Sequence, residues 1–134
     1  MAERVLIFGF DGLDPDFFNR HRERFPVLSG LVSNGSSGKL RSTVPPFSLT
    51  AWPSAMSGMN PAKTGVICFP EKDFVDQPIE YTSQSVEVPR MWDIAGFNHK
   101  KVGIINVPLT YPPPPVNGFL VSGFLTPGPE REFT

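Results

Sequence analysis

The sequence predicts an α/β fold with a mostly parallel sheet. Two apolar runs, Val5–Phe10 and Lys101–Val107, lack the polar alternation of a half-exposed strand and are typical of short strands buried on both faces. Helical patterns lie between the apolar runs, and strands that alternate with helices favour βαβ units with parallel strands. At 134 residues, the chain has the length of one domain with a real core.

The first helical patterns have clear start and stop signals. Asp14 is a good N-cap and Pro15 suits the first helical position, so a helix is expected from there to about Arg24. Apolar residues at helical spacing within 27–32 predict a second helix, which ends where Gly35 follows an asparagine.

The rest of the chain alternates further elements with stiff connections, since sixteen prolines lie between apolar segments. We expect residues 70–89, which are polar and without periodicity, to form a surface excursion or lid, and 108–117 a proline-rich loop. The other expected elements are a strand over 39–44, a helix over 49–56 ending near Gly58, an extended segment over 64–69, a helix over 88–95 ending at Gly96, and a strand over 119–124.

Composition excludes several classes of protein. The net charge is -1 and no long basic cluster exists, which argues against binding of a nucleic-acid duplex. The single cysteine, Cys68, cannot form an internal disulfide and is expected to be a small core residue in a reducing, cytoplasmic compartment. No apolar run is long enough for a membrane span. No helix follows the last expected strand, so we expect the chain to be the front part of a longer fold.

One acid follows the first apolar run directly. Asp11 would lie at the carboxyl end of the strand predicted over Val5–Phe10, and ligands of open α/β sheets bind outside the carboxyl ends of strands. Gly12 lets the chain turn sharply beside it. Asp11 is therefore either a ligand-binding acid or a residue that begins a turn.

Two hydroxyl residues stand where a proline-rich segment enters the helix predicted over 49–56. Ser48 and Thr50 both fall near its N-terminus, where free N–H groups and the helix dipole stabilise anions. Each residue is either a helix cap or a nucleophile whose alkoxide is stabilised by the helix and a metal ion.

Asp11-Gly-Leu-Asp14 resembles the first metal-binding motif of the alkaline phosphatase superfamily, and residues 45–69 resemble its nucleophile segment. The chain is most similar to the type I phosphodiesterase and nucleotide pyrophosphatase branch, including the predicted phosphohydrolase/phosphomutase proteins of prokaryotes. Residues 102–128 are also similar to that prokaryotic group. The resemblance implies the N-terminal portion of an alkaline-phosphatase-like three-layer α/β/α sandwich, with residues 1–134 as part of one catalytic domain.

The resemblance also implies roles for individual residues. Asp11 matches the metal-ligating acid, and Ser48 matches the nucleophile, which is itself a metal ligand; Thr50 is the alternative if the register is shifted by two residues. The chain departs from the family pattern at Thr64, where a histidine is usual, and at Ala51, where nucleotide pyrophosphatases carry a phosphate-binding asparagine. Substrate contacts are therefore expected to differ from that subgroup.

Two divalent metal ions are implied as cofactors, usually zinc, with manganese or magnesium as alternatives. They would be held by several further aspartates and histidines. The chain has only His21 and His99, which lie in polar surroundings and are expected at the surface. We therefore expect the remaining ligands beyond Thr134 and expect this piece alone to be inactive.

The implied function is metal-dependent hydrolysis of phosphodiester or nucleotide pyrophosphate bonds through a covalent phosphoserine-type intermediate. The partner is then a small-molecule phosphoester, with no membrane or nucleic-acid duplex, and the oligomeric state stays open. One alternative is a phosphomutase or sulfatase of the same superfamily. The other is a non-catalytic phosphate-binding or interaction domain, in which Ser48 only caps a helix and Asp11 only begins a turn.

Overall fold

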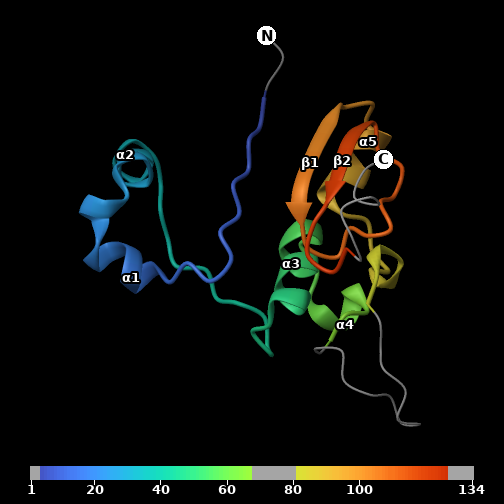
Figure 1. The fold of residues 1–134 in the computed structure, drawn as a ribbon, viewed down its shortest axis with the longest axis horizontal. Coiled ribbons are helices and arrows are strands. Elements are labelled where there is room, and N and C mark those ends of the chain that lie inside the picture. Colours follow the sequence, from blue (N-terminus) through green and yellow to red (C-terminus); the bar gives the residue numbers. More distant parts are fainter. Residues whose placement is uncertain (1–3, 68–80, 127–134) are drawn as a thin grey trace. The chain divides into compact units, whose positions relative to one another are not determined.

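The computed structural model describes residues 4–67 and 81–126. The chain forms two compact units, Met1–Arg41 and Ser42–Thr134, each with its own elements (Figure 1). Cys68 and most of the predicted lid lie outside the described residues. Within the described residues, no helix is both long and apolar enough to cross a bilayer.

The first unit contains two short helices joined by a 3-10 turn. They are α1 (Pro15–Arg20), the 3-10 turn (Arg22–Arg24) and α2 (Pro26–Asn34). The predicted N-cap is confirmed, because the Asp14 carboxylate accepts a hydrogen bond from the Asp16 amide at 2.8 Å. The first helix is shorter than predicted: His21 leaves helical geometry at φ -125°. Pro26 also disfavours helical backbone at the residue before it, so the chain starts a new helix there.

Side-chain contacts hold the first unit together. Phe18 is buried and packs edge-on against Phe25, with ring centroids 5.8 Å apart. The Lys39 ammonium lies 2.7 Å from the Asp16 carboxylate and ties the segment after α2 back to α1. The hydrogen bond that the Lys39 ammonium donates to this carboxylate raises the pKa of Lys39.

Two predicted strands of the first half are absent. Neither Val5–Phe10 nor residues 39–44 form a strand, and the first segment is exposed, with Phe8 72% accessible. A strand exists only where a neighbouring strand completes its backbone hydrogen bonds. Within the described residues only β1 and β2 pair in this way.

The second unit carries the predicted helices and strands. Its described elements are α3 (Ser48–Ser57), α4 (Pro61–Thr64), a 3-10 turn (Ser83–Ser85), α5 (Met91–Phe97), β1 (Val102–Val107) and β2 (Gly118–Ser122). The predicted stop of α3 is confirmed, since Gly58 adopts the left-handed conformation at φ 70°. Of the segment expected to be extended over 64–69, only Thr64 is helical, as the last residue of the short helix α4 that Asn60 caps, and residues 68–69 lie outside the described residues.

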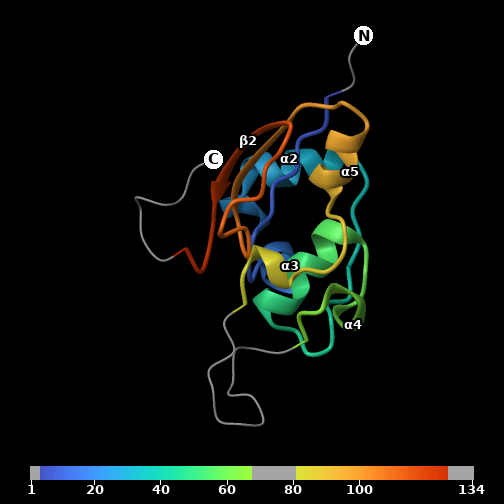
Figure 2. The ribbon, with the colours of Figure 1, turned by 90° about the vertical axis from the view of Figure 1, so that its right-hand side faces the viewer.

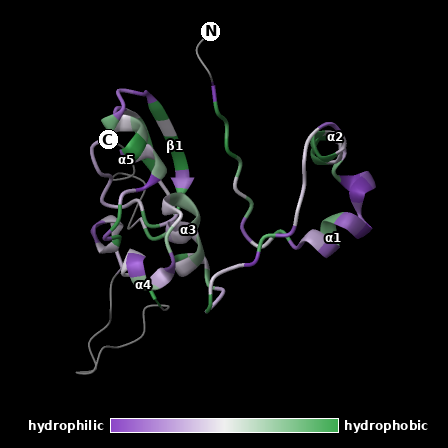
Figure 3. Cartoon of the chain, turned by 180° about the vertical axis from the view of Figure 1, so that it is seen from behind, coloured by the Kyte–Doolittle hydropathy of each residue, from purple (hydrophilic) through white to green (hydrophobic). Residues whose placement is uncertain are grey.

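The strands β1 and β2 form a parallel pair. Val102 stands opposite Gly118 and Ile104 opposite Leu120, and the register shifts after Ile105. The parallel pairing agrees with the predicted parallel sheet and with the α/β class, although the segment that joins these two strands, residues 108–117, contains no helix. The strand β1 is hydrophobic over most of its length and hydrophilic near its carboxyl end (Figure 3).

The core of the second unit lies between the sheet and two helices. Trp92 of α5 packs with Ile104 and Leu120 of the two strands, and Met56 near the end of α3 packs against them. Figure 2 shows α3 and α5 on one side of β2. Burial of these apolar side chains, at about 25 cal/mol per Å², is the main force that fixes α3 relative to the strands.

Candidate functional site

Ser48 is the first residue of α3. Phe47 precedes it as N-cap and makes no side-chain hydrogen bond to the helix. The Ser48 side chain is half-buried, and its hydroxyl has no hydrogen-bond partner among the described residues. The first amides of a helix have no preceding carbonyl to bond, so α3 offers a hydroxyl and N–H donors at one point.

The N-terminus of α3 lies at the carboxyl edge of the sheet. Leu49, next to Ser48, is buried against Leu109, which comes two residues after the end of β1. The far end of α3 packs through Met56 on the middle of the strands. Figure 1 accordingly shows α3 next to the arrowhead of β1. Ser48 therefore stands where open α/β sheets bind ligands.

Thr50 has a different environment. It is fully buried, with 0% of its surface exposed. Its hydroxyl lies 2.9 Å from the carbonyl oxygens of Pro45 and Phe47, to which it can donate, and 3.0 Å from the hydroxyl of Thr43. Thr50 thus holds the proline-rich segment against α3, and this geometry favours Ser48 as the reactive hydroxyl.

We expect Thr50→Val to weaken folding by about 0.5–1.5 kcal/mol, because it removes the hydroxyl that bonds the carbonyls of Pro45 and Phe47, while Thr43 still donates to Pro45. The measurement is the free energy of unfolding of the complete protein, together with turnover per folded molecule, which should not change. Thr50→Ser keeps the hydroxyl and is the matched control. Loss of turnover at unchanged stability would instead identify Thr50 as the nucleophile.

Asp11 lies in an exposed turn of the first unit. Gly12 beside it has φ 69°, which agrees with the sharp turn that the sequence predicts. Ser48 belongs to the second unit. The structure therefore places Asp11 and Ser48 each within its own unit. That both residues bind the same metal ion is a proposal.

Among the described residues, neither histidine belongs to a cluster of ligands. His21 contacts the ring of Phe17, with centroids 4.8 Å apart, and its Nδ1 lies 3.8 Å from Glu23. His99 is exposed in the turn after α5. Across residues 4–67 and 81–126, no three His, Cys, Asp or Glu side chains are grouped as a metal site would require. Zinc needs at least three protein ligands, so these residues alone do not fit a two-metal centre.

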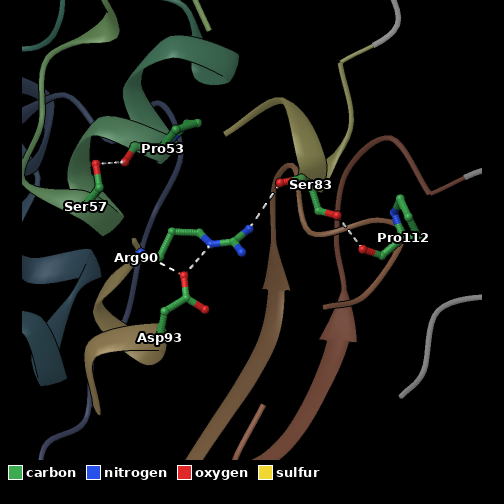
Figure 4. Close-up of polar contacts among 6 residues, drawn as sticks. All are labelled: Pro53, Ser57, Ser83, Arg90, Asp93 and Pro112. Carbon is green, nitrogen blue, oxygen red and sulfur yellow. Dashed lines mark hydrogen bonds and ion pairs between the residues drawn. The ribbon is translucent and has the colours of Figure 1, made fainter. Parts of the chain in front are cut away.

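A network of polar contacts holds the loop that follows β1 at the carboxyl edge of the sheet (Figure 4). The Arg90 guanidinium donates to Asp93 at 3.0 Å and to the carbonyl of Ser83 at 3.4 Å. Ser83 in turn donates from its hydroxyl to the carbonyl of Pro112 and from its amide to Tyr111. Sequence reasoning missed this network. Its one local signal is the three-residue spacing of Arg90 and Asp93 at the start of a helix.

Thr110 joins the carboxyl ends of the two strands. Its buried hydroxyl donates to the carbonyl of Val107 at 2.6 Å and accepts from the amide of Gly123 at 3.1 Å. Ser122 donates to the carbonyl of Thr110 at 2.9 Å. The backbone around this edge is therefore held on both strands, as a preorganised site requires.

A hydroxyl at a helix N-terminus, set at the carboxyl edge of parallel strands, is typical of α/β enzymes that act on anionic substrates. Residues 5–131 match the family model of type I phosphodiesterase / nucleotide pyrophosphatase. This match covers nearly the whole chain, so the protein belongs to that family and the resemblance seen in its motifs is confirmed. No curated protein and no solved structure matches the chain. Family membership indicates a phosphodiesterase-like hydrolase with a small-molecule phosphoester as substrate.

Proposed function

We propose that the complete protein hydrolyses phosphodiester or nucleotide pyrophosphate bonds, with Ser48 as the nucleophile. The observation that carries the proposal is the half-buried Ser48 hydroxyl, which has no partner among the described residues and stands in the first turn of α3. The family match supports the reaction class. The burial of Thr50 in a structural contact supports the choice between the two hydroxyls.

In the first step the Ser48 oxygen attacks phosphorus and loses its proton, while the bond from phosphorus to the leaving oxygen breaks and that oxygen takes up a proton. The product is a phosphoserine-type ester. Water then attacks the same phosphorus and returns Ser48 to its free hydroxyl. The N–H groups and dipole at the start of α3 stabilise the charge that builds up on the phosphoryl oxygens.

The two-stranded sheet is proposed to be part of the three-layer sandwich that the family resemblance implies. Both units are proposed to belong to one catalytic domain, because the family match runs from residue 5 to residue 131 without a break. The same resemblance leads us to propose that activity depends on divalent ions, with Asp11 and Ser48 among the ligands. The two steps of the reaction are derived without these ions.

We expect the complete protein to cleave bis(p-nitrophenyl) phosphate, and to lose this activity in a chelating buffer. A two-metal hydrolase needs its ions to stabilise the attacking and leaving oxygens. Turnover should return on addition of zinc, with manganese and magnesium compared at equal concentration. Faster cleavage of a sulfate ester would favour the sulfatase alternative, and full activity in the chelator would overturn the metal requirement.

A further inference from the structure

The strand β1 contains one extra residue near its carboxyl end. Ile105 pairs with Val121 and Val107 pairs with Ser122, so Asn106 has no partner residue on β2. Asn106 also has φ 59°, in the left-handed region where residues other than glycine are uncommon. The feature is a β-bulge, and bulges of this kind often lie next to active sites, where they redirect a side chain.

The bulge changes which residue faces the core. Val102 and Ile104 pack on the side of the sheet that Trp92 covers, and the two-residue period of a strand would place Asn106 on that side next. Val107 packs there instead, and Asn106 is exposed. The extra residue therefore places a carboxamide in solvent at the carboxyl edge and keeps an apolar residue in the core.

Gly123, the residue directly after β2, leaves room for this conformation. A Cβ on Gly123 would lie 2.5 Å from the carbonyl carbon of Asn106 and 2.6 Å from the carbonyl oxygen of Val107, so only glycine fits there. Leu109 also has a positive φ, 57°. Two such residues within four positions form a cluster of uncommon backbone, and clusters of this kind are found at ligand-binding sites.

The same edge carries the proposed nucleophile. Leu109, three residues after Asn106, is buried against Leu49, the residue next to Ser48. A carboxamide offers two N–H donors without a charge, which suits the unprotonated oxygens of a phosphoester. From this placement we infer that Asn106 is a substrate-binding residue that donates a hydrogen bond to a non-bridging phosphoryl oxygen. The inference rests on the function proposed above.

Two substitutions separate a binding role from a backbone role. Asn106→Gly keeps the left-handed backbone and removes the carboxamide, so the melting temperature should not fall while kcat/KM for bis(p-nitrophenyl) phosphate falls about 10- to 100-fold. Asn106→Asp keeps the shape and brings a negative charge to the anion, so kcat/KM should fall further. Asn98→Asp makes the same change at an exposed site between α5 and β1. It should leave kcat/KM unchanged.

The affinity of the complete protein for inorganic phosphate, measured by calorimetry, gives a readout that does not need turnover. We expect weaker phosphate binding in both Asn106 variants. Wild-type kinetics and phosphate affinity in Asn106→Gly would overturn the inference and leave the proposed function standing, with Asn106 present only because it tolerates a positive φ. A wild-type protein that neither cleaves phosphoesters nor binds phosphate would overturn both.

Discussion

Ser48→Ala in the complete protein is expected to lower phosphoester turnover by about 10³-fold or more, because the substitution removes the attacking oxygen. Folding should be nearly unaffected, within about 0.5 kcal/mol, since the hydroxyl has no hydrogen-bond partner among the described residues. The measurements are kcat under saturating bis(p-nitrophenyl) phosphate and the free energy of unfolding of the same samples. Loss of activity without loss of stability would mark Ser48 as a residue of the reaction.

The same helix offers a matched control. Ser57 lies at the other end of α3 and donates a hydrogen bond to the carbonyl of Pro53 at 2.6 Å (Figure 4). Ser57→Ala should keep wild-type turnover. If Ser48→Ala also keeps turnover, or if a trapped phosphoryl group is found on another residue, the nucleophile proposed here is wrong.

Arg90→Ala is expected to destabilise the protein by about 3 kcal/mol, the largest effect on folding that we predict. The Arg90 and Asp93 side chains are only 11% and 20% exposed, so removal of the cation leaves a poorly solvated carboxylate. The guanidinium also lies 5.3 Å from the ring centre of Trp92 and bonds the carbonyl of Ser83. Urea unfolding of the complete protein measures the change.

Two milder variants test whether the geometry of Arg90 matters. Arg90→Lys keeps the charge but not the planar set of donors, so we expect an intermediate loss. Asp93→Asn keeps an oxygen that can accept from the Arg90 amide, a contact of 2.8 Å, and removes only the charge. Equal stability of Arg90→Ala and the wild type would show that the network adds nothing to folding.

Local signals in the sequence predicted the helices well. Asp14 and Pro15 mark the start of α1, and Gly58 marks the stop of α3, because caps and stops act over one turn of backbone. The strands β1 and β2 were also predicted from apolar runs, and their pairing agrees with the predicted parallel sheet, although a proline-rich loop and not a helix joins them. These patterns indicated the α/β class, and the motifs around Asp11 and Ser48 indicated the family.

Strand partners and side-chain burial needed the tertiary structure. Val5–Phe10 has the same apolar pattern as β1, yet it forms no strand, because pairing depends on a neighbour that sequence spacing does not reveal. The bulge at Asn106 is likewise a property of two strands in register.

The proposed choice between the two hydroxyls also rests on the tertiary structure. Ser48 and Thr50 stand two residues apart in the first turn of one helix, and local pattern treats them alike. Packing separates them, because the Thr50 hydroxyl contacts the carbonyls of Pro45 and Phe47, whereas Ser48 stays half-buried and its hydroxyl bonds none of the described residues. The sequence by itself determined the helix and its hydroxyls. Only the tertiary structure shows how far each hydroxyl is buried, since burial depends on residues that fold against the helix, and this burial supports the proposal that Ser48 is the nucleophile.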